Sequence, residues 1–334
     1  MKVSARVSSP NDATVLVFGP YNGDGVAELE RRFTVRKLEK RDIDLLPEGE
    51  RGAIRAVAVA GHLPNAVIDA LPNLEIVGHF GVGYDGVDAA HAATRGVAVT
   101  NTPDVLTEEV ADTTLGLILM TVRELGQAEA HARAGRWSAE GPFPLTRFSL
   151  RGKTVGIMGL GRIGLAIAKR LEAFGLTIAY HNRSRRTDVP YAYHDTLEGL
   201  ARAVDILVVA APGGAATDRA VNASVLRALG PEGIFINIGR GSTVDEPALI
   251  AALRDGTIAR AGLDVFADEP HIPDALMALP NAVLLPHVAS ASRDTRRAMG
   301  LLVADNLSAW FAGETLPTPV PESADAGLTR AKAS

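Results

Sequence analysis

Short apolar runs alternate with polar, helix-compatible segments over the first hundred residues. The apolar runs are TVLVFG at 14–19, IRAVAVAG at 54–61, LEIVGHF at 74–80 and GVAVTNTP at 96–103, and Gly, Pro or Asn closes each of them. VAELERRF at 26–33 and NAVIDAL at 65–71 are compatible with helices between these runs. Because apolar strands that alternate with helices are typical of parallel sheets covered on both faces, the pattern predicts an α/β unit.

The alternation pauses in the middle of the chain and then restarts. TEEVADTTLGLILMTVREL predicts one long helix from Thr107, with two acidic residues in its first turn. The stretch 132–152 mixes Gly and Pro with aromatic residues such as Trp137 and Phe143, and predicts an irregular arm. The later strands are predicted in KTVGIMG, LTIAYHN at 176–182, ILVVAAP at 206–212, GIFINIG at 233–239, RAGLDVF at 260–266 and AVLLPH at 282–287. These strands predict a second α/β unit.

A last helix is predicted from about Ser292 to Ala312. Its apolar stripe consists of Met299, Val303, Leu307, Trp310 and Phe311. Such a stripe must pack against another element. The proline-rich LPTPVPE and the polar tail that follow are too short to form a further domain.

Length and composition favour a soluble protein of two domains. A chain of 334 residues exceeds what one hydrophobic core usually organises, and 47% hydrophobic with 22% charged residues is typical of globular proteins. The longest apolar stretch, TTLGLILMTV, is far shorter than the roughly 20 residues of a membrane-spanning helix. The N-terminal MKVSARVSSPNDA lacks the apolar centre of a secretory signal, so we expect a loose extension and a cytoplasmic protein.

Charge and cysteine content exclude several classes of function. The chain has no cysteine, which excludes disulfides, thiol catalysis and cysteine-based metal sites, and no metal site is expected. A formal net charge of -5 argues against a general nucleic-acid surface, although a local basic pocket is compatible with it.

The segment GIMGLGRIGLAIAKRL carries Gly159, Gly161 and Gly164 in the G-x-G-x-x-G spacing, between a predicted strand and a helix that begins near Arg162. The first glycine permits the tight turn, the second the approach of a pyrophosphate, and the third close packing of helix on strand. Backbone N–H groups of the first helical turn, at Arg162 and Ile163, would face the phosphate. The pattern favours a dinucleotide pocket over tight packing alone.

The next predicted strand ends at Tyr180 and is followed by a basic segment, with no acidic residue before Asp188. NAD pockets usually carry a carboxylate here for the ribose 2′-hydroxyl, whereas a 2′-phosphate is attracted by arginine. The segment contains Asn182, Arg183, Ser184, Arg185 and Arg186. It predicts a preference for NADP(H), with NAD(H) possible and Arg183 as the first choice for the phosphate contact. The alternative is a solvated basic turn.

Three polar residues follow apolar strands of the second unit: Arg240 in NIGRGSTVDE, Glu269 in ADEP and His287 in PHVAS. Open α/β sheets collect ligands and catalytic groups beyond the carboxyl ends of their strands. Each residue alone is explained as readily by an exposed turn charge, a loop acid or a core histidine.

Together with the glycine motif, these stretches resemble the D-isomer-specific 2-hydroxyacid dehydrogenases. The resemblance runs from about Ala13 to Pro321 and rests on GVGYDGVD, TEEVADTTLGLIL, GLGRIG, NIGRGSTVDEPALIAAL, AGLDVFADEP and LLPHVASAS. Within that family the chain looks most like the NADPH-dependent glyoxylate/hydroxypyruvate reductases, including their hydroxyphenylpyruvate-reducing members.

The resemblance implies an α/β fold of two parallel-sheet domains, with a Rossmann nucleotide domain at 104–288 inserted into a flavodoxin-like substrate domain formed by 1–103 and 289–334. The active site would be a cleft that closes over cofactor and substrate. Relatives form dimers through the arm, and in some an aromatic residue reaches the partner's substrate pocket, so a homodimer is expected. A buried structural role for Trp137 is the alternative.

Chemistry and resemblance together suggest a role for each residue in reducing a 2-oxo acid. The planar, permanently charged fork of Arg240 suits an anion clamp for the substrate carboxylate. His287 would be the general acid, and Glu269 would orient its ring and favour its protonated form. Further substrate contacts are expected from the backbone N–H groups of Val82 and Gly83 and from Ser290.

The resemblance also implies further cofactor contacts, at Thr107, Ala211, Pro212, Thr217, Ile238 and Asp264. Asp264 would lie near the nicotinamide carboxamide. The chain departs from many relatives at Gly214, where they carry a threonine, and this puts one hydroxyl contact along the cofactor in doubt.

Several alternatives remain open at this point. Reduction of glyoxylate or hydroxypyruvate to glycolate or D-glycerate competes with reduction of 2-ketogluconate or hydroxyphenylpyruvate, with phosphite oxidation, and with a non-enzymatic cofactor sensor. A formate dehydrogenase is disfavoured because a glutamine would be expected in place of Glu269. A phosphoglycerate dehydrogenase with an added regulatory domain is disfavoured because no chain is left to build that domain.

Overall fold

The computed structural model describes residues 13–330, and it divides into two compact units. The first unit comprises the described residues up to Leu106 together with those from Ser292 onward, and the second unit is Thr107–Ala291. The sequence prediction placed these divisions at 103/104 and 288/289. The extension expected at the N-terminus lies, as far as Asp12, outside the described residues.

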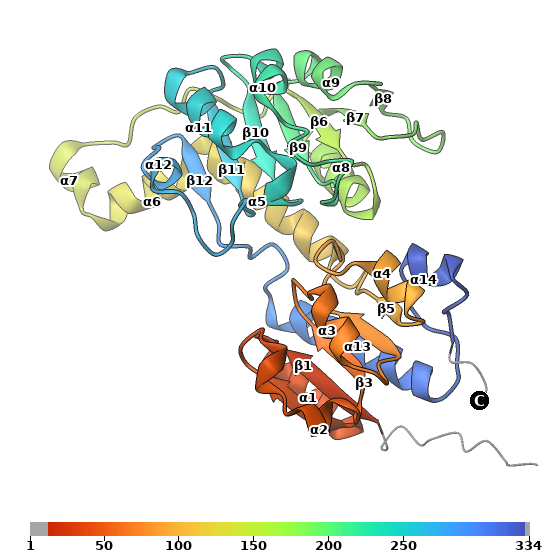
Figure 1. Cartoon of the computed structure of the whole chain (residues 1–334). Coiled ribbons are helices and arrows are strands. Elements are labelled where there is room, and N and C mark those ends of the chain that lie inside the picture. Colours follow the sequence, from red (N-terminus) through yellow and green to blue (C-terminus); the bar gives the residue numbers. More distant parts are fainter. Residues whose placement is uncertain (1–12, 331–334) are drawn as a thin grey trace, which may run out of the picture. The chain divides into compact units, whose positions relative to one another are not determined.

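The first unit is a five-stranded parallel sheet with helices around it (Figure 1). Its strands are β1 (Thr14–Phe18), β2 (Thr34–Leu38), β3 (Ile54–Val59), β4 (Ile76–His79) and β5 (Ala98–Thr100). Its helices are α1 (Gly23–Arg32), α2 (Glu48–Arg51), α3 (Asn65–Ala70), α4 (Ala89–Thr94), α13 (Arg293–Phe311) and α14 (Pro321–Asp325). The strand order β2-β1-β3-β4-β5 is that of flavodoxin-like sheets, as the resemblance predicts.

Helix α13 returns from the far end of the chain and packs on α1 and β4. The predicted stripe is buried in full, at Met299, Val303, Leu307, Trp310 and Phe311. The helices α1 and α13 meet at two glycines, because a Cβ added to Gly300 would lie 2.7 Å from the Cα of Gly25. The prediction that this helix packs on another element is therefore confirmed.

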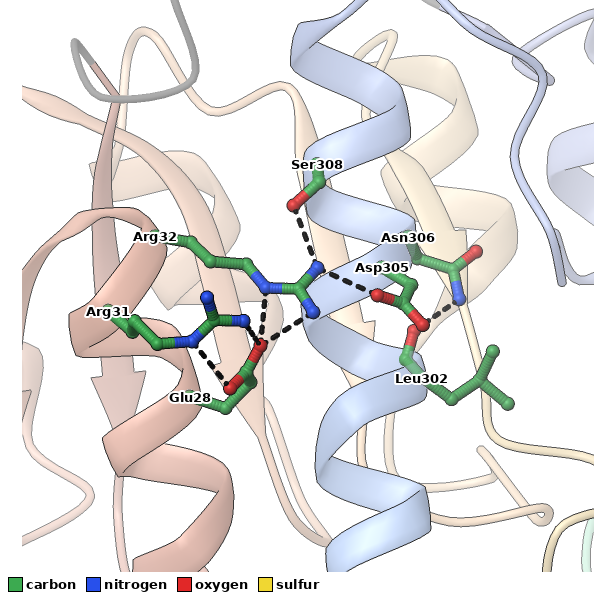
Figure 2. A network of polar contacts seen from close by, with 7 residues as sticks. All are labelled: Glu28, Arg31, Arg32, Leu302, Asp305, Asn306 and Ser308. Atoms are coloured by element: carbon green, nitrogen blue, oxygen red, sulfur yellow. Dashed lines mark hydrogen bonds and ion pairs between the residues drawn. The ribbon is translucent and has the colours of Figure 1, made fainter.

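A polar network also joins α1 to α13 (Figure 2). Arg32 donates to Glu28 within α1, and its Nη1 lies 2.7 Å from Oδ1 of Asp305 and 3.2 Å from Oγ of Ser308 on α13. The hydrogen bond from Arg31 is the main cause that lowers the pKa of Glu28 to about 2. The carboxylate therefore stays ionised down to acidic pH, and the network stabilises the contact between the two helices.

The second unit is a seven-stranded parallel sheet of order β12-β11-β10-β9-β6-β7-β8. Its strands are β6 (Thr154–Met158), β7 (Thr177–His181), β8 (Ala192–Tyr193), β9 (Ile206–Val209), β10 (Ile234–Asn237), β11 (Arg260–Leu263) and β12 (Ala282–Leu284). Its helices are α5 (Thr107–Arg123), α6 (Leu125–Arg133), α7 (Arg136–Glu140), α8 (Arg162–Ala173), α9 (Leu197–Ala203), α10 (Ala223–Leu229), α11 (Glu246–Asp255) and α12 (Asp274–Met277). The prediction of two parallel sheets is confirmed, and all strands named from the sequence are present.

The long helix predicted from Thr107 is confirmed, but its end and the first part of the arm differ from the prediction. The helix from Thr107 ends at Arg123 because Glu124 adopts a left-handed conformation with φ of 53°, and α6 then begins at Leu125. The arm is irregular only after Gly141, since α6 and α7 occupy its first part. The side chain of Trp137 is 69% exposed, so the alternative of a buried structural role is also wrong.

Two strands were not predicted because they lack an apolar run. β2 reads TVRKL and is largely exposed at the edge of its sheet, where charged side chains hinder pairing with another chain. β8 has only two residues. Within residues 13–330, every helix is too short or too polar to cross a lipid bilayer.

Candidate active site

The predicted site residues of the second unit follow strands of its parallel sheet, so they lie along one edge. The strand order reverses between β6 and β9, which is where open α/β sheets bind ligands. On one side of this point, the glycine loop follows β6 and the basic segment follows β7. On the other side, Arg240, Glu269 and His287 follow β10, β11 and β12, which are neighbours in the sheet.

The three glycines of the loop have different surroundings. Gly159 has φ of +94°, and a Cβ there would lie 2.6 Å from the backbone nitrogen of Ala211, while a Cβ on Gly164 would lie 2.3 Å from the carbonyl oxygen of Gly159. A Cβ on Gly161, the N-cap of α8, would meet nothing within 4 Å. Gly159 and Gly164 therefore serve close packing. Gly161 instead leaves the backbone accessible beside the N-terminus of α8, which begins at Arg162. This arrangement fits a pyrophosphate.

The basic segment after β7 is tied to the glycine loop by two of its members. Oδ1 of Asn182 accepts from the N–H of Leu160 at 2.7 Å, and Nη1 of Arg186 donates to the Leu160 carbonyl at 3.0 Å. Arg186 also pairs with Asp188, and this hydrogen bond is the main cause that lowers the pKa of the Asp188 carboxyl. The side chain of Arg186 is thus engaged in holding the loop.

Arg183, Ser184 and Arg185 are exposed beside that anchored pair. Over residues 13–330 no acidic side chain pairs with Arg183 or Arg185. Their positive charge is therefore open to an anion at the position where a ribose 2′-phosphate would lie. The donors of the segment fit the 2′-phosphate of NADP(H) in charge.

The loop after β9 contains three of the expected cofactor contacts. Ala211 is buried, and the hydroxyl of Thr217 donates to the Pro212 carbonyl at 2.7 Å, which holds the loop in shape. Gly214 has φ of +120°, a conformation that a threonine rarely adopts. The glycine that stands here in place of the threonine of many relatives therefore suits the backbone conformation of the loop.

Two other expected contacts lie on neighbouring elements of the second unit. Ile238 is buried directly after β10, and Thr107 is the first residue of α5. Neither makes a side-chain interaction that identifies its role.

His287 and Glu269 form a direct hydrogen bond. Nδ1 of His287 lies 2.6 Å from Oε2 of Glu269, whose Oε1 accepts from the N–H of Phe266 at 3.1 Å. Since a carboxylate only accepts, Nδ1 carries the hydrogen and Nε2 is left for a substrate. The side chains of His287 and Glu269 are 45% and 34% exposed, so this nitrogen is accessible.

Arg240 is brought near this pair by a glycine. A Cβ on Gly241 would lie 1.9 Å from the backbone of Phe266, so the loop after β10 can approach the loop after β11 only with glycine at this position. Burial alone would raise the pKa of Glu269. The hydrogen bond and charge of His287, the Phe266 N–H and the charge of Arg240 outweigh burial and lower this pKa. Glu269 is therefore an anion flanked by two cationic or potentially cationic groups.

Asp264 has a structural role that the sequence did not indicate. Its buried carboxylate accepts from the N–H of Val288 at 2.7 Å and of Ala289 at 2.9 Å. Burial raises the pKa of Asp264, although these two hydrogen bonds oppose the rise. The two bonds fix the backbone directly after His287, which itself has an unusual φ of 52°. Ser290 follows at a buried position.

In the first unit, Val82 and Gly83 follow β4. The side chain of Asn101 donates to the Val82 carbonyl at 2.8 Å, and the N–H of Thr102 donates to the Gly81 carbonyl at 2.9 Å. Both bonds hold the loop through its carbonyl groups and leave its N–H groups out of these two contacts. In the described part of the chain the N–H of Val82 donates to no acceptor, so it is available to a ligand.

A Rossmann sheet with this glycine loop, and an arginine, a glutamate and a histidine at its carboxyl edge, defines a nucleotide-dependent oxidoreductase. The model of the D-isomer specific 2-hydroxyacid dehydrogenase NAD-binding domain matches residues 115–289. The chain belongs to this family.

Several known proteins are similar to this chain over nearly its whole length. It is 49% identical to glyoxylate/hydroxypyruvate reductase A of Arabidopsis thaliana, over 92% of this chain and 98% of that protein. It is 46% identical to the hydroxyphenylpyruvate reductase of Plectranthus scutellarioides, over the same shares of the two chains. Among solved structures, the NADPH-dependent glyoxylate/hydroxypyruvate reductase of Sinorhizobium meliloti in complex with NADP and malonate has a TM-score of 0.93 and 55% identity, and the match covers 97% of this chain and 100% of that chain.

Proposed function

We propose that this protein uses NADPH to reduce a small 2-oxo acid, glyoxylate or hydroxypyruvate, to the D-2-hydroxy acid, glycolate or D-glycerate. The observation that carries the proposal is the 2.6 Å hydrogen bond between His287 and Glu269, with Arg240 near enough to lower the pKa of Glu269. Relatives at 49% and 55% identity that are named as reductases of these two acids support the choice of substrate.

We assign the cofactor to residues of the second unit. The reduced nicotinamide supplies the hydride when it is bound. The residues proposed to hold the cofactor are Thr107, Gly159, Gly161, Arg162, Ile163, Gly164, Asn182, Arg183, Ser184, Arg185, Ala211, Pro212, Thr217, Ile238 and Asp264. The open backbone at Gly161 and the anchoring of Asn182 support this assignment most directly.

Arg240 clamps the substrate carboxylate through its planar fork, which matches the geometry of two carboxylate oxygens. Val82 and Gly83 are proposed as backbone donors to the same carboxylate, and Ser290 as a further substrate contact. Fixing the carboxylate orients the adjacent carbonyl carbon for hydride transfer, which converts binding energy into correct geometry.

His287 polarises the carbonyl oxygen and gives it a proton from Nε2 as the alkoxide develops. Nδ1 remains bonded to Glu269, whose negative charge stabilises the imidazolium before the proton leaves. Asp264, through the N–H groups of Val288 and Ala289, keeps the histidine loop in place. One hydride and one proton are added to the carbonyl, and the protein returns to its starting state when His287 takes a proton from water.

A panel of 2-oxo acids tests the proposed substrate. Glyoxylate, hydroxypyruvate, hydroxyphenylpyruvate and 2-ketogluconate are compared at steady state with NADPH and with NADH. We expect the largest kcat/KM for one of the first two acids with NADPH. If hydroxyphenylpyruvate has the largest value instead, the substrate assignment changes to that of the relative at 46% identity.

Arg183→Ala is expected to raise the KM for NADPH about tenfold, because a charge-assisted bond to the 2′-phosphate is lost. The KM for NADH should change little, since NADH has no 2′-phosphate. Arg185→Ala is the matched variant, because it removes the same charge from an equally exposed neighbour. Equal effects of Arg183→Ala on both cofactors would contradict the phosphate contact.

We also propose a homodimer that forms through the arm. A cavity of about 730 Å³ is lined by residues of α6, α7 and the segment after them, among them Gln127, His131 and Phe143. Leu145 is fully exposed and Trp137 of α7 is 69% exposed, so two large apolar side chains of the arm are available to be covered in a dimer.

Analytical ultracentrifugation tests this assembly. We expect twice the 35.0 kDa mass of the chain, and a shift toward monomer for the double variant Trp137→Asp, Leu145→Asp. Leu45→Asp is the control, because Leu45 is an exposed apolar residue of the first unit. A wild-type monomer would contradict the proposal.

We further propose a cytoplasmic location, on the ground that the reaction consumes NADPH, which cells retain inside. Fractionation followed by detection of the protein tests it, and recovery from the medium would contradict it.

A further inference from the structure

The sheet of the first unit has its own reversal of strand order, between β1 and β3. β2 lies on one side of β1, and β3, β4 and β5 follow on the other side. Such a reversal leaves a crevice outside the carboxyl ends of the two strands, where α/β sheets bind ligands. At this point the chain has Gly19 directly after β1, and Ala60 and Gly61 directly after β3.

Arg41, which follows β2, extends across both of these strand ends. A Cβ on Gly19 would lie 2.7 Å from Cγ and Nε of Arg41, and a Cβ on Gly61 would lie 3.1 Å from its Nη2. Both glycines have positive φ, of 80° and 83°. Nη2 also donates to the carbonyl of Ala60. The two glycines therefore form a seat that a larger residue at either position would obstruct.

The charge of Arg41 is not balanced within this seat. The side chain is exposed, and its contact with Ala60 uses one of the five N–H donors of a guanidinium. Across residues 13–330 no carboxylate pairs with Arg41. A carbonyl oxygen does not neutralise a cation, so the remaining donors are available to an anion.

The loop of Val82 and Gly83 lies beside this seat in the same unit. Nε2 of His79, the last residue of β4, is 3.2 Å from the Gly61 carbonyl. A Cβ on Gly86 would lie 2.6 Å from the same carbonyl, so the segment after β4 packs on the segment after β3. The strands β3 and β4 are neighbours in the sheet, about 4.8 Å apart, so Arg41 at the end of β3 and the loop after β4 lie at adjacent strand ends.

We propose that Arg41 is a specificity-determining residue that binds a second carboxylate at the far end of the substrate. The class of substrate is a 2-oxo dicarboxylate of four or five carbons, whose two carboxylates span about the distance between two neighbouring strand ends. The near carboxylate would bind at Val82 and Gly83, as in the proposed function, on which this inference rests. The site then reduces such diacids in addition to glyoxylate and hydroxypyruvate.

A matched pair of substrates isolates the contribution of the far carboxylate. 2-Oxoglutarate and 2-oxopentanoate have the same chain length, and only the former has a carboxylate at its far end. We expect the wild-type KM for 2-oxoglutarate to be about tenfold lower than that for 2-oxopentanoate, which is the value of one charge-assisted hydrogen bond.

Arg41→Met should bring this ratio close to one, because the long apolar side chain still fills the seat on Gly19 and Gly61 without offering a donor. The KM for glyoxylate, which has no far group, should stay within about twofold of the wild-type value. Lys40→Met is the control, because it removes the same charge from the adjacent exposed position and should preserve the ratio.

Each other outcome contradicts a specific claim. If the two five-carbon acids have equal KM in the wild type, or if Arg41→Met leaves their ratio unchanged while glyoxylate is still reduced, Arg41 only closes the loop after β2. If Arg41→Met raises the KM of glyoxylate equally, the residue acts on the shape of the loop. If the wild type reduces neither glyoxylate nor hydroxypyruvate, the proposed function itself is wrong.

Discussion

Replacing His287 by alanine is expected to lower kcat for glyoxylate and hydroxypyruvate by about 10² to 10⁴, the usual contribution of a positioned general acid. The affinity for NADPH, measured by fluorescence titration, should change by less than about twofold, because the histidine acts on the carbonyl oxygen of the substrate and not on the nucleotide. A variant with nearly normal kcat would remove His287 from the role of the acid.

The pH dependence of the same variant adds a second criterion. In the wild type, the rate of reduction should fall as pH rises, because only the protonated imidazole can give a proton. The lowered pKa of Glu269 keeps its carboxylate ionised throughout the neutral range, so a change in the charge of Glu269 does not cause this fall. His287→Ala should lose this dependence and show a flat profile.

Glu269→Gln separates charge from orientation. The glutamine can still accept from Nδ1, but it no longer stabilises the imidazolium, so the rate should be lower than that of the wild type across the pH profile. A profile identical to that of the wild type would mean that the carboxylate only positions the ring.

Replacing Arg240 by methionine is expected to lower kcat/KM for both acids by about 10² to 10³, because two charge-assisted hydrogen bonds to the substrate carboxylate are lost together. Most of the loss should appear in KM if the clamp acts on the bound substrate and the transition state alike. Steady-state kinetics over a wide range of substrate concentrations measures this division.

Arg240→Lys is the informative companion. It keeps the positive charge near Glu269 but loses the planar fork, so we expect a value between those of the wild type and Arg240→Met. If lysine restores full activity, the charge alone is sufficient and the two-pronged clamp is contradicted. Circular dichroism of both variants checks that they are folded, because Arg240 is next to Gly241, which packs on the backbone of Phe266.

Most of the fold could be predicted because the signal is local. Buried parallel strands are continuous apolar runs, and every run that was predicted to be a strand is one. The elements that were missed have no such signal. β2 is an exposed edge strand with charged residues, and the break at Glu124 depends on a left-handed conformation in a residue that rarely adopts it.

The candidate site was predictable in its composition but not in its connections. Arg240, Glu269 and His287 could be named because each directly follows an apolar strand, and parallel strands share one carboxyl edge. The bonds that Asp264 accepts from the backbone after His287 join residues 24 and 25 positions apart, and no spacing rule indicates them. The seat of Arg41 was likewise hidden, since it depends on the order in which β1, β2 and β3 pair.

The most direct test of the central claim is the stoichiometry and stereochemistry of turnover by the purified protein. With hydroxypyruvate and NADPH, we predict that one molecule of NADP⁺ forms for each molecule of D-glycerate, and that NADH supports the reaction less well. Binding of NADPH without turnover of any 2-oxo acid would contradict the proposal and would indicate a cofactor sensor that retains the family's fold.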